Sequence, residues 1–256
     1  MIKSVLASTI LAFAVSLGSP ASAQGLSDQD VYNIARDAYV YAYPIVTMDL
    51  SMRQSTNVPM RNTMPLRAPI NQFAHARTYP RAEDRDVVRY NFDTLYSPVW
   101  LDLAAEPIDP VGSRYGPVAT ICCRCWTCGP TCSVSSGPAR PEPRPEILRL
   151  VAPGWAGALP EGVTRIVAPT STIWILGRTQ TNGPSDYEAV HKVQDGYRLT
   201  PLSQMGQDGL PPPAAVATDP AVDDKTPPLV QVNRMDGVAV LGRLCRADGE
   251  ISATRQ

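Results

Sequence analysis

The sequence predicts an α+β fold, with an N-terminal amphipathic helix followed by an antiparallel, β-rich sheet. Apolar residues between positions 31 and 43 recur at helical spacing, whereas residues 87–101 are rich in strand-forming side chains. Two further β-branched runs lie at 163–168 and 172–178, and a later helix is expected after residue 185. Because helices and strands fall in separate blocks, the pattern favours α+β over alternating βαβ units.

The first helix is expected to begin at Ser27, whose side chain can cap the first turn while Asp30 completes a capping box. The helical spacing of apolar residues continues as far as Pro44, and a proline normally ends or kinks a helix. We therefore expect one amphipathic helix up to Pro44 and a second helical stretch from Ile45 to about Met52.

The middle of the chain is expected to consist of loops and strands. Residues 53–85 are polar and interrupted by prolines, which predicts a long ordered loop. Residues 86–103 favour two short strands around a tight turn at Asn91 and Asp93.

The second half of the chain is expected to add a strand pair, a helix and an arm. The runs 163–168 and 172–178 flank a Pro-Thr-Ser turn and predict two neighbouring strands. Ser185 is placed to cap the later helix, which carries His191. The prolines of residues 201–228 favour an extended arm or linker.

Residues 1–23 have the composition of a removable signal peptide. Lys3 precedes an apolar run from Val5 to Leu17, and Ala21-Ser22-Ala23 matches the small-x-small pattern that signal peptidase accepts. The apolar run is shorter than the roughly 20 residues that a membrane-spanning helix needs. We therefore expect a periplasmic or secreted protein, with no membrane span after cleavage.

The charge balance and the motifs exclude several classes of function. The chain has 23 basic and 24 acidic residues, and no basic run favours nucleic acid or anionic lipid as a partner. Its two histidines lack metal-binding spacing, and no glycine-rich phosphate loop or Gly-x-Ser-x-Gly elbow is present. We expect no metal and no cofactor.

Polar side chains are concentrated at the turn within residues 86–103. On a strand, Arg89, Asn91 and Asp93 share one face, and charges in a half-buried sheet must be paired or meet a ligand. Arg89 can hold a carboxylate or phosphate through two hydrogen bonds. Alternatively, Asn91 and Asp93 cap a turn and Arg89 pairs with a carboxylate. The candidate ligand-binding residues are His75, Arg89, Asn91, Asp93, Thr94, Tyr96 and Arg178.

Two functions remain compatible with these residues. One is a cell-envelope module that binds a small polar ligand, a glycan or a partner. The other is an envelope hydrolase acting on a glycan or amide bond, with His75 and Asp93 as acid and base. The second requires His75 or another carboxylate within hydrogen-bond reach of Asp93 inside a cleft.

Several motifs resemble those of a known family, domain of unknown function 1254. They are Asn71-Gln72-Phe73-x-His75, then Val87-Val88-Arg89-x-Asn91-x-Asp93-Thr94-Leu95-Tyr96-Ser97, and Trp174-Ile175-Leu176-Gly177-Arg178-Thr179-Gln180-Thr181. We assign residues 24–237 to a domain of this kind. The resemblance implies jelly-roll-like sheets and a continuation into a second domain, domain of unknown function 1214, which we expect to be missing here.

Residues 116–147 depart from that resemblance. Permitted codons for Ile121–Cys132, read in a shifted frame, give Leu-Leu-Pro-Met-Leu-Asp-Met-Trp-Thr-Asp-Val, which the resemblance implies at this point. We interpret the segment as the product of a frameshift, and expect it to be irregular and poorly packed. We interpret residues 238–256 as a similarly aberrant tail before an early stop, because Leu244–Glu250 can be re-read as Phe-Ala-Ala-Leu-Met-Ala. Such a chain is expected to be unstable or functionally compromised.

The cysteines allow a different interpretation of the same segment. Five of the six lie within residues 122–132, as expected for a metal-thiolate cluster, a redox pair at Cys125 and Cys128, or disulfides. A zinc site, however, needs two separated ligand pairs, and this run is one dense group. All six cysteines fall within the segments attributed to frameshifts, which favours the frameshift interpretation.

Overall fold

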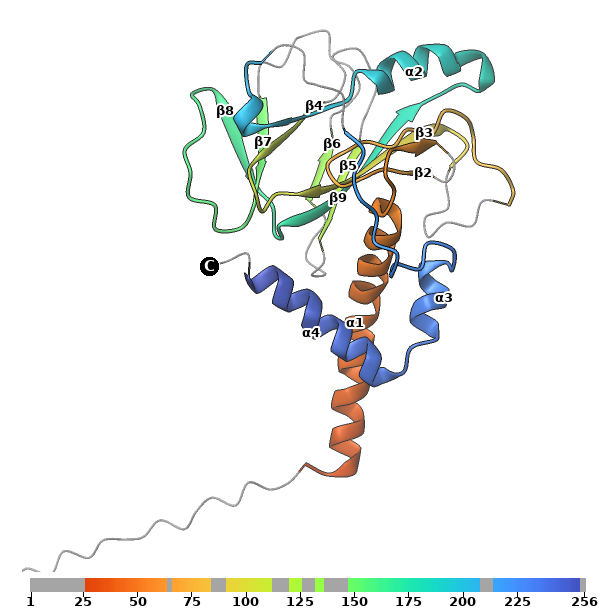
Figure 1. Cartoon of the computed structure of the whole chain (residues 1–256), viewed down its shortest axis with the longest axis vertical. Coiled ribbons are helices and arrows are strands. Elements are labelled where there is room, and N and C mark those ends of the chain that lie inside the picture. Colours follow the sequence, from red (N-terminus) through yellow and green to blue (C-terminus); the bar gives the residue numbers. More distant parts are fainter. Residues whose placement is uncertain are drawn as a thin grey trace, which may run out of the picture.

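The computed structural model describes residues 26–63, 66–83, 91–111, 120–125, 132–135, 147–207 and 214–253. Two four-stranded sheets form the body, and a long N-terminal helix runs out from beneath it (Figure 1). The α+β class predicted from the sequence is confirmed. The jelly-roll-like arrangement stays a prediction.

Helix α1 (Asp28–Thr56) is one continuous helix of 29 residues. The predicted capping box is present, because Ser27 Oγ accepts from Asp30 N and the Asp30 carboxylate accepts from Ser27 N. The predicted helix end at Pro44 is wrong. Proline removes the hydrogen bond to the carbonyl of Val40, but Val40 is 65% exposed, so water can replace that donor. Buried residues beyond the proline hold the helix together.

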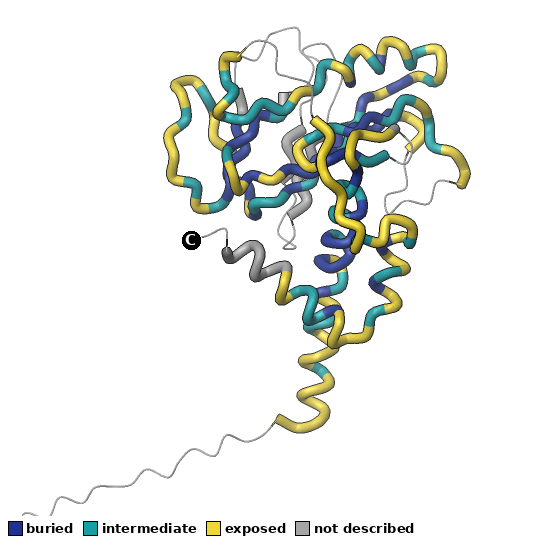
Figure 2. The backbone as a smooth tube through the Cα atoms, in the orientation of Figure 1, coloured by how far each residue is buried: buried dark blue, intermediate teal, exposed yellow. Residues whose placement is uncertain are grey.

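The two halves of α1 have different surroundings. Its C-terminal half packs into the body, whereas the first half projects into solvent (Figure 2). The projecting half exposes several large apolar side chains, namely Val31, Tyr32, Ile34, Val40 and Tyr41. The predicted amphipathic helix is therefore buried only beyond about Ala42.

The first sheet has the strand order β3-β9-β5-β6, with every pair antiparallel. Its members are β3 (Thr94–Asp102), β5 (Thr120–Cys125), β6 (Cys132–Ser135) and β9 (Thr172–Gln180). The second sheet has the order β10-β4-β7-β8. Its members are β4 (Ile108–Val111), β7 (Ile147–Val151), β8 (Val163–Val167) and β10 (Arg198–Pro201). Two-residue strands β1 (Asn62–Thr63) and β2 (Leu66–Arg67) pair separately.

A hydrophobic core joins the two sheets. Strands β3 and β9 contribute Val99, Leu101, Ile173 and Ile175, and the second sheet contributes residues such as Leu150. The predicted strands at 163–168 and 172–178 exist, but they do not pair with each other. Strand β8 pairs in parallel with β7, and the chain then crosses to the other sheet as β9. The expectation of purely antiparallel sheets was therefore wrong for the β7–β8 pair.

Two other local predictions need correction. Only one of the two strands expected in residues 86–103 is described, as β3, and residues 84–90 lie outside the described residues. The later helix consists of a 3-10 turn, η1 (Pro184–Asp186), followed by α2 (Tyr187–Asp195), and Ser185 does not cap it. The residue at the cap is Asp186, whose carboxylate instead accepts from the backbone N–H of Asn182 at 3.0 Å.

The segment expected to be irregular contains two strands, so that prediction was wrong for residues 120–125 and 132–135. Backbone hydrogen bonds form a ladder with any side chains, and β5 pairs with β9 in this way. The rest of 116–147, apart from Ile147, lies outside the described residues. The frameshift itself stays a prediction.

The C-terminal part of the chain packs on α1. Residues 214–227 have no helix or strand, and the side chain of Asn57 exchanges two hydrogen bonds with the backbone of Asp219, at 2.7 and 2.9 Å. After the 3-10 turn η2 (Leu202–Gln204), the last helices are α3 (Pro228–Asn233) and α4 (Gly237–Ala253). The buried carboxylate of Asp49 on α1 pairs with Arg53 at 2.8 Å and with Arg243 of α4 at 2.5 Å. The described part of the predicted aberrant tail is therefore helical and docked at least as far as Leu244.

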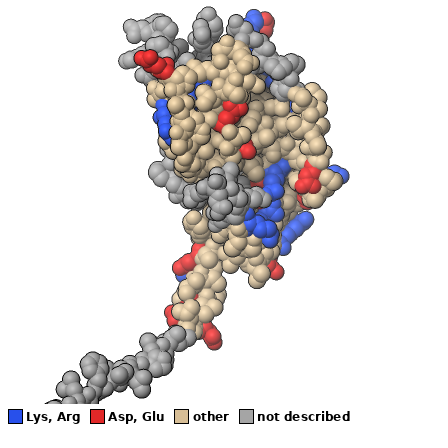
Figure 3. Space-filling view, turned by 60° about the vertical axis from the view of Figure 1, so that its left-hand side comes forward, with Lys and Arg blue, Asp and Glu red and all other residues tan. Residues whose placement is uncertain are grey.

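No helix in the described part of the chain has the length and apolarity needed to cross a membrane. Figure 3 shows charged side chains of both signs in small groups, separated by surface that is neither acidic nor basic. This distribution agrees with the net charge of −1.

Candidate functional site

A loop that lies along the edge of β3 positions the site. Backbone N–H groups of Ala74 and Ala76 donate to the carbonyls of Pro98 and Tyr96, at 3.0 and 2.8 Å. The alternation of these bonds extends the sheet without forming a regular strand. His75 is thereby held against β3, and Arg77 follows two residues later.

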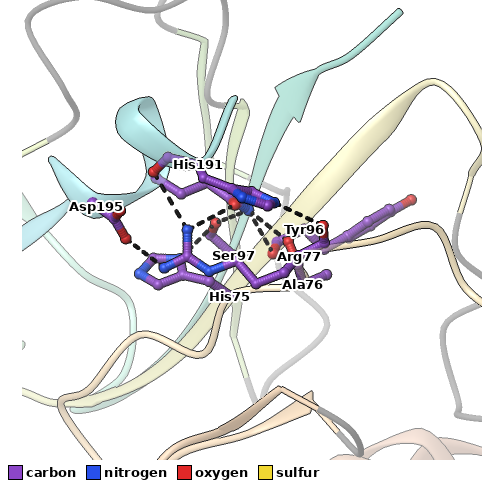
Figure 4. A network of polar contacts seen from close by, with 8 residues as sticks. His75, Ala76, Arg77, Tyr96, Ser97, His191 and Asp195 are labelled. Carbon is purple, nitrogen blue, oxygen red and sulfur yellow. Dashed lines mark hydrogen bonds and ion pairs between the residues drawn. The ribbon is translucent and has the colours of Figure 1, made fainter. Parts of the chain in front are cut away.

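A buried polar network connects this loop to β3 and α2 (Figure 4). His75 Nδ1 lies 2.9 Å from Ser97 Oγ. The side-chain amide of Gln194 donates to Ser97 Oγ at 3.1 Å, and to the backbone carbonyls of Ala76 at 3.1 Å and Tyr96 at 3.3 Å. One fully buried side chain of α2 therefore joins the loop to the strand.

The surroundings of His75 favour its neutral form. Ser97 Oγ accepts from Gln194, and its own hydroxyl proton can be donated to His75 Nδ1. The pKa of His75 is lowered from 6.5 to about 4, chiefly by burial and also by the positive charges of Arg77 and Arg61, against the raising effect of Asp195. His75 is therefore neutral near pH 7.

Ser97 does not fit the role of a nucleophile. It has no exposed surface, and both of its described side-chain partners hold it in the interior. A hydroxyl that cannot meet a substrate cannot attack it. The network is therefore a means of holding His75 in place.

Gly177 on β9 lies opposite Ser97, and it must be small. A Cβ atom at Gly177 would lie 2.9 Å from the Ser97 carbonyl oxygen and 3.2 Å from Ser97 Cβ. We expect Gly177→Ala to destabilise the protein by about 1–3 kcal/mol, because the backbone of β3 would have to move. Urea unfolding measures the effect.

The control for that substitution is Gly237→Ala in α4, where a Cβ would meet nothing within 4 Å. It should leave the stability unchanged or raise it slightly, since alanine favours a helix. Equal stability of the two variants would show that β3 and β9 do not need the close approach.

Arg77 and three residues of α2, His191, Gln194 and Asp195, form the outer edge of this network, which we call the rim. Arg77 Nη1 donates to the His191 carbonyl at 3.3 Å and to Gln194 Oε1 at 3.4 Å, and Nη2 pairs with the Asp195 carboxylate. In return, His191 Nε2 lies 2.7 Å from the Arg77 carbonyl. Both histidines of the chain therefore lie at this site.

Aromatic rings surround His75. Phe73 stacks on it with ring centroids 5.8 Å apart, and Tyr197 lies 6.1 Å from His75 and 5.7 Å from Phe73. The Tyr197 hydroxyl lies 2.7 Å from Thr179 Oγ1, and burial raises the pKa of this tyrosine. Phe73 and Tyr197 are each partly exposed, and Phe73 also packs against the core between the two sheets.

The structure separates the residues that the sequence grouped together. Because adjacent residues of a strand point to opposite faces, Ser97 and its partner His75 lie on one face of β3, and Tyr96 points to the other. On that other face, the guanidinium of Arg178 stacks over the Tyr96 ring at 5.1 Å. The Tyr96 hydroxyl also accepts from Asn91 N at 3.1 Å.

The remaining predicted residues do not join His75. Thr94 Oγ1 is buried and has no hydrogen-bond partner among the described residues, Asp93 is exposed, and Arg89 lies outside the described residues. Asp93 precedes Ser97 by four positions, or about 13 Å of strand. Among the described residues no hydrogen bond links His75 to Asp93, so the acid–base pair required for the hydrolase is not assembled here.

Sequence reasoning missed most of the residues that surround His75. These are Arg77, Ser97, His191, Gln194, Asp195 and Tyr197. Helical spacing alone places His191 on the same face as Gln194 and Asp195, which was the one available indication. Nothing in the sequence indicates that this face meets the loop at residues 71–77. In the described part of the chain, no group of three His, Cys, Asp or Glu side chains is suited to a metal ion.

Comparisons with known proteins give a family but no activity. Among solved structures, the VPA0106 protein from Vibrio parahaemolyticus is similar, with 23% identity and a TM-score of 0.47. The match covers 78% of this chain but only 45% of that protein, so this chain spans less than half of its length. A search of curated proteins found no match. A family model described as a protein of unknown function, DUF1254, matches residues 70–201. The chain therefore belongs to the DUF1254 family.

Proposed function

We propose that this protein is an exported module of the cell envelope that binds a small polar ligand at the surface above His75. Export is supported by the signal-peptide composition of residues 1–23. Binding is supported by one observation above all. A buried, neutral histidine lies beside two partly exposed aromatic residues and the charged pair Arg77–Asp195.

This combination of groups suits ligand recognition. Binding sites for small molecules combine apolar and aromatic walls with a few fixed polar groups. Phe73 and Tyr197 supply such walls, and Arg77 and Asp195 supply polar groups whose positions are fixed by α2. All of these residues lie outside the segments attributed to frameshifts, so the site does not depend on them.

The hydrolase alternative has no comparable support. It needs an acid–base pair or an accessible nucleophile, whereas His75 bonds to a serine without exposed surface. We therefore propose binding alone.

The two histidines provide a direct test, because each ring has its own proton NMR signals and both rings lie at the site. The purified protein is titrated with glucose, N-acetylglucosamine, glycine and acetate as representatives of small polar ligands. We expect at least one compound to shift the signals of both histidines in a saturable manner. If these four compounds and the aromatic pair tested in the next subsection all leave both signals unchanged, the proposal is wrong.

A further inference from the structure

Arg77 is held in a fixed position by the last turn of α2. Its Nη1 atom has two acceptors on this helix, the carbonyl of His191 and the side chain of Gln194. Its own carbonyl lies 2.7 Å from His191 Nε2, which fixes the backbone at the same point. The second terminal nitrogen, Nη2, pairs with Asp195. Arg77 is thus a preorganised guanidinium with one carboxylate on its outer side.

The carboxylate of Asp195 is in an unfavourable place for a negative charge. Asp195 is the last residue of α2, and the C-terminal end of a helix carries partial negative charge. Its side chain is 61% exposed, and ion pairs at such exposed positions contribute little stability. Arg77 is the described partner that offsets this placement, and the pair can be opened at little cost.

A second arginine adds to the positive charge of the site. Arg61 lies close enough to His75 for its charge to lower the pKa of that ring, and in the described structure it has no hydrogen bond or ion pair. Because His75 is neutral, the two positive charges of Arg61 and Arg77 exceed the single negative charge of Asp195. Opening the Arg77–Asp195 pair would increase that excess at the guanidinium itself, which favours the arrival of an anion.

The aromatic rings specify the rest of the ligand. Phe73 and Tyr197 lie within 6 Å of each other beside His75, and both are partly exposed. Such rings favour an apolar or planar group over a strongly hydrated one. The charged and apolar parts of the site are therefore adjacent.

We infer that the ligand is a small carboxylic acid with an apolar body, whose carboxylate takes the place of Asp195 on Arg77. A guanidinium can bind a carboxylate through two parallel hydrogen bonds, and Arg77 Nη2 already pairs with one carboxylate oxygen of Asp195. The body of the ligand would then lie against Phe73 and Tyr197. This inference rests on the proposed function, because it specifies the ligand of the same site.

The test uses benzoate and its neutral analogue benzamide, followed through the ring signals of the two histidines. We expect benzoate to shift both signals in a saturable manner and benzamide to bind at least about tenfold more weakly. Asp195→Asn removes the competing carboxylate and should strengthen benzoate binding about three- to tenfold. Arg77→Gln should weaken it about tenfold or more.

The control is Glu188→Gln, which removes the same charge from the same helix at a residue paired with Lys192. It should leave benzoate binding within about twofold of the parent protein, because this pair is fully exposed and lies away from Arg77. If Asp195→Asn fails to strengthen binding, or strengthens it no more than Glu188→Gln, the displacement of Asp195 is refuted. Because Asp195 is exposed, we expect Asp195→Asn to fold, and its result tests the inference even if Arg77→Gln does not fold.

The outcomes also separate this inference from the function on which it rests. If benzamide or a neutral sugar binds as well as benzoate, the site binds polar ligands but does not select an anion. If no compound of either panel shifts the histidine signals, the proposed binding function is itself wrong.

Discussion

Replacing Gln194 with leucine is expected to lower the free energy of unfolding by about 2–4 kcal/mol. The Gln194 side chain has no exposed surface, and its amide supplies donors to Ala76, Tyr96 and Ser97. Leucine has nearly the same size but no donor, so the carbonyl of Ala76 would lose its described partner in the interior. Buried acceptors without a donor cost more than the same bond contributes in water.

Urea unfolding of the parent and of the Gln194→Leu protein measures this loss. Gln29→Leu is the matched control, because Gln29 lies on the exposed part of α1 and bonds only to the side chain of Asn33. We expect the control to change the stability by no more than about 0.5 kcal/mol. If both substitutions have the same small effect, α2 is not joined to β3 through this amide.

Acidification is expected to destabilise the protein between pH 6.5 and about 4 through His75. The pKa of this ring is lowered to about 4 in the folded protein, chiefly by burial. An unfolded chain therefore binds a proton at His75 in this range while the folded protein does not, so stability falls as the pH falls. The contribution is fully present above pH 6.5, and a displacement of this size corresponds to about 3 kcal/mol lost at pH 4.

The measurement compares the unfolding free energy at pH 7, 5 and 4 with that of His75→Gln, which cannot take up the proton. The variant should be less stable at pH 7 but should lose less on acidification. His191→Gln also removes an imidazole but keeps His75, and it should retain the pH dependence of the parent. Parallel pH profiles for the parent and His75→Gln would contradict the assignment.

Some of the fold was predictable because its causes are local. The start of α1 follows from Ser27 and Asp30, which exchange hydrogen bonds within one turn. Strand β9 follows from its run of β-branched and apolar side chains. The partner of β8 was not predictable, since a run of strand-forming residues does not state whether it pairs with β7 or β9.

The wrongly predicted helix end at Pro44 also shows that local sequence does not report distant packing contacts. Locally, proline costs a hydrogen bond and favours a break. The structure continues the helix because Ala42, Val46 and Leu50 pack against residues of α3 and α4, more than 180 positions later in the chain. Those contacts offset the lost bond, and no local pattern reports them.

For the candidate site too, some features were predictable from the sequence and others depended on the tertiary structure. The sequence by itself identified a concentration of polar side chains at residues 89–96, including Tyr96, and named His75 as a further candidate. Only the tertiary structure decided that these two residues lie on opposite faces of β3, and that His75 meets Ser97, Gln194 and Arg77 rather than Asp93. The reason is physical. Side-chain type and spacing along the chain define which face a residue occupies within its own element, whereas the partner of that face depends on how distant elements pack.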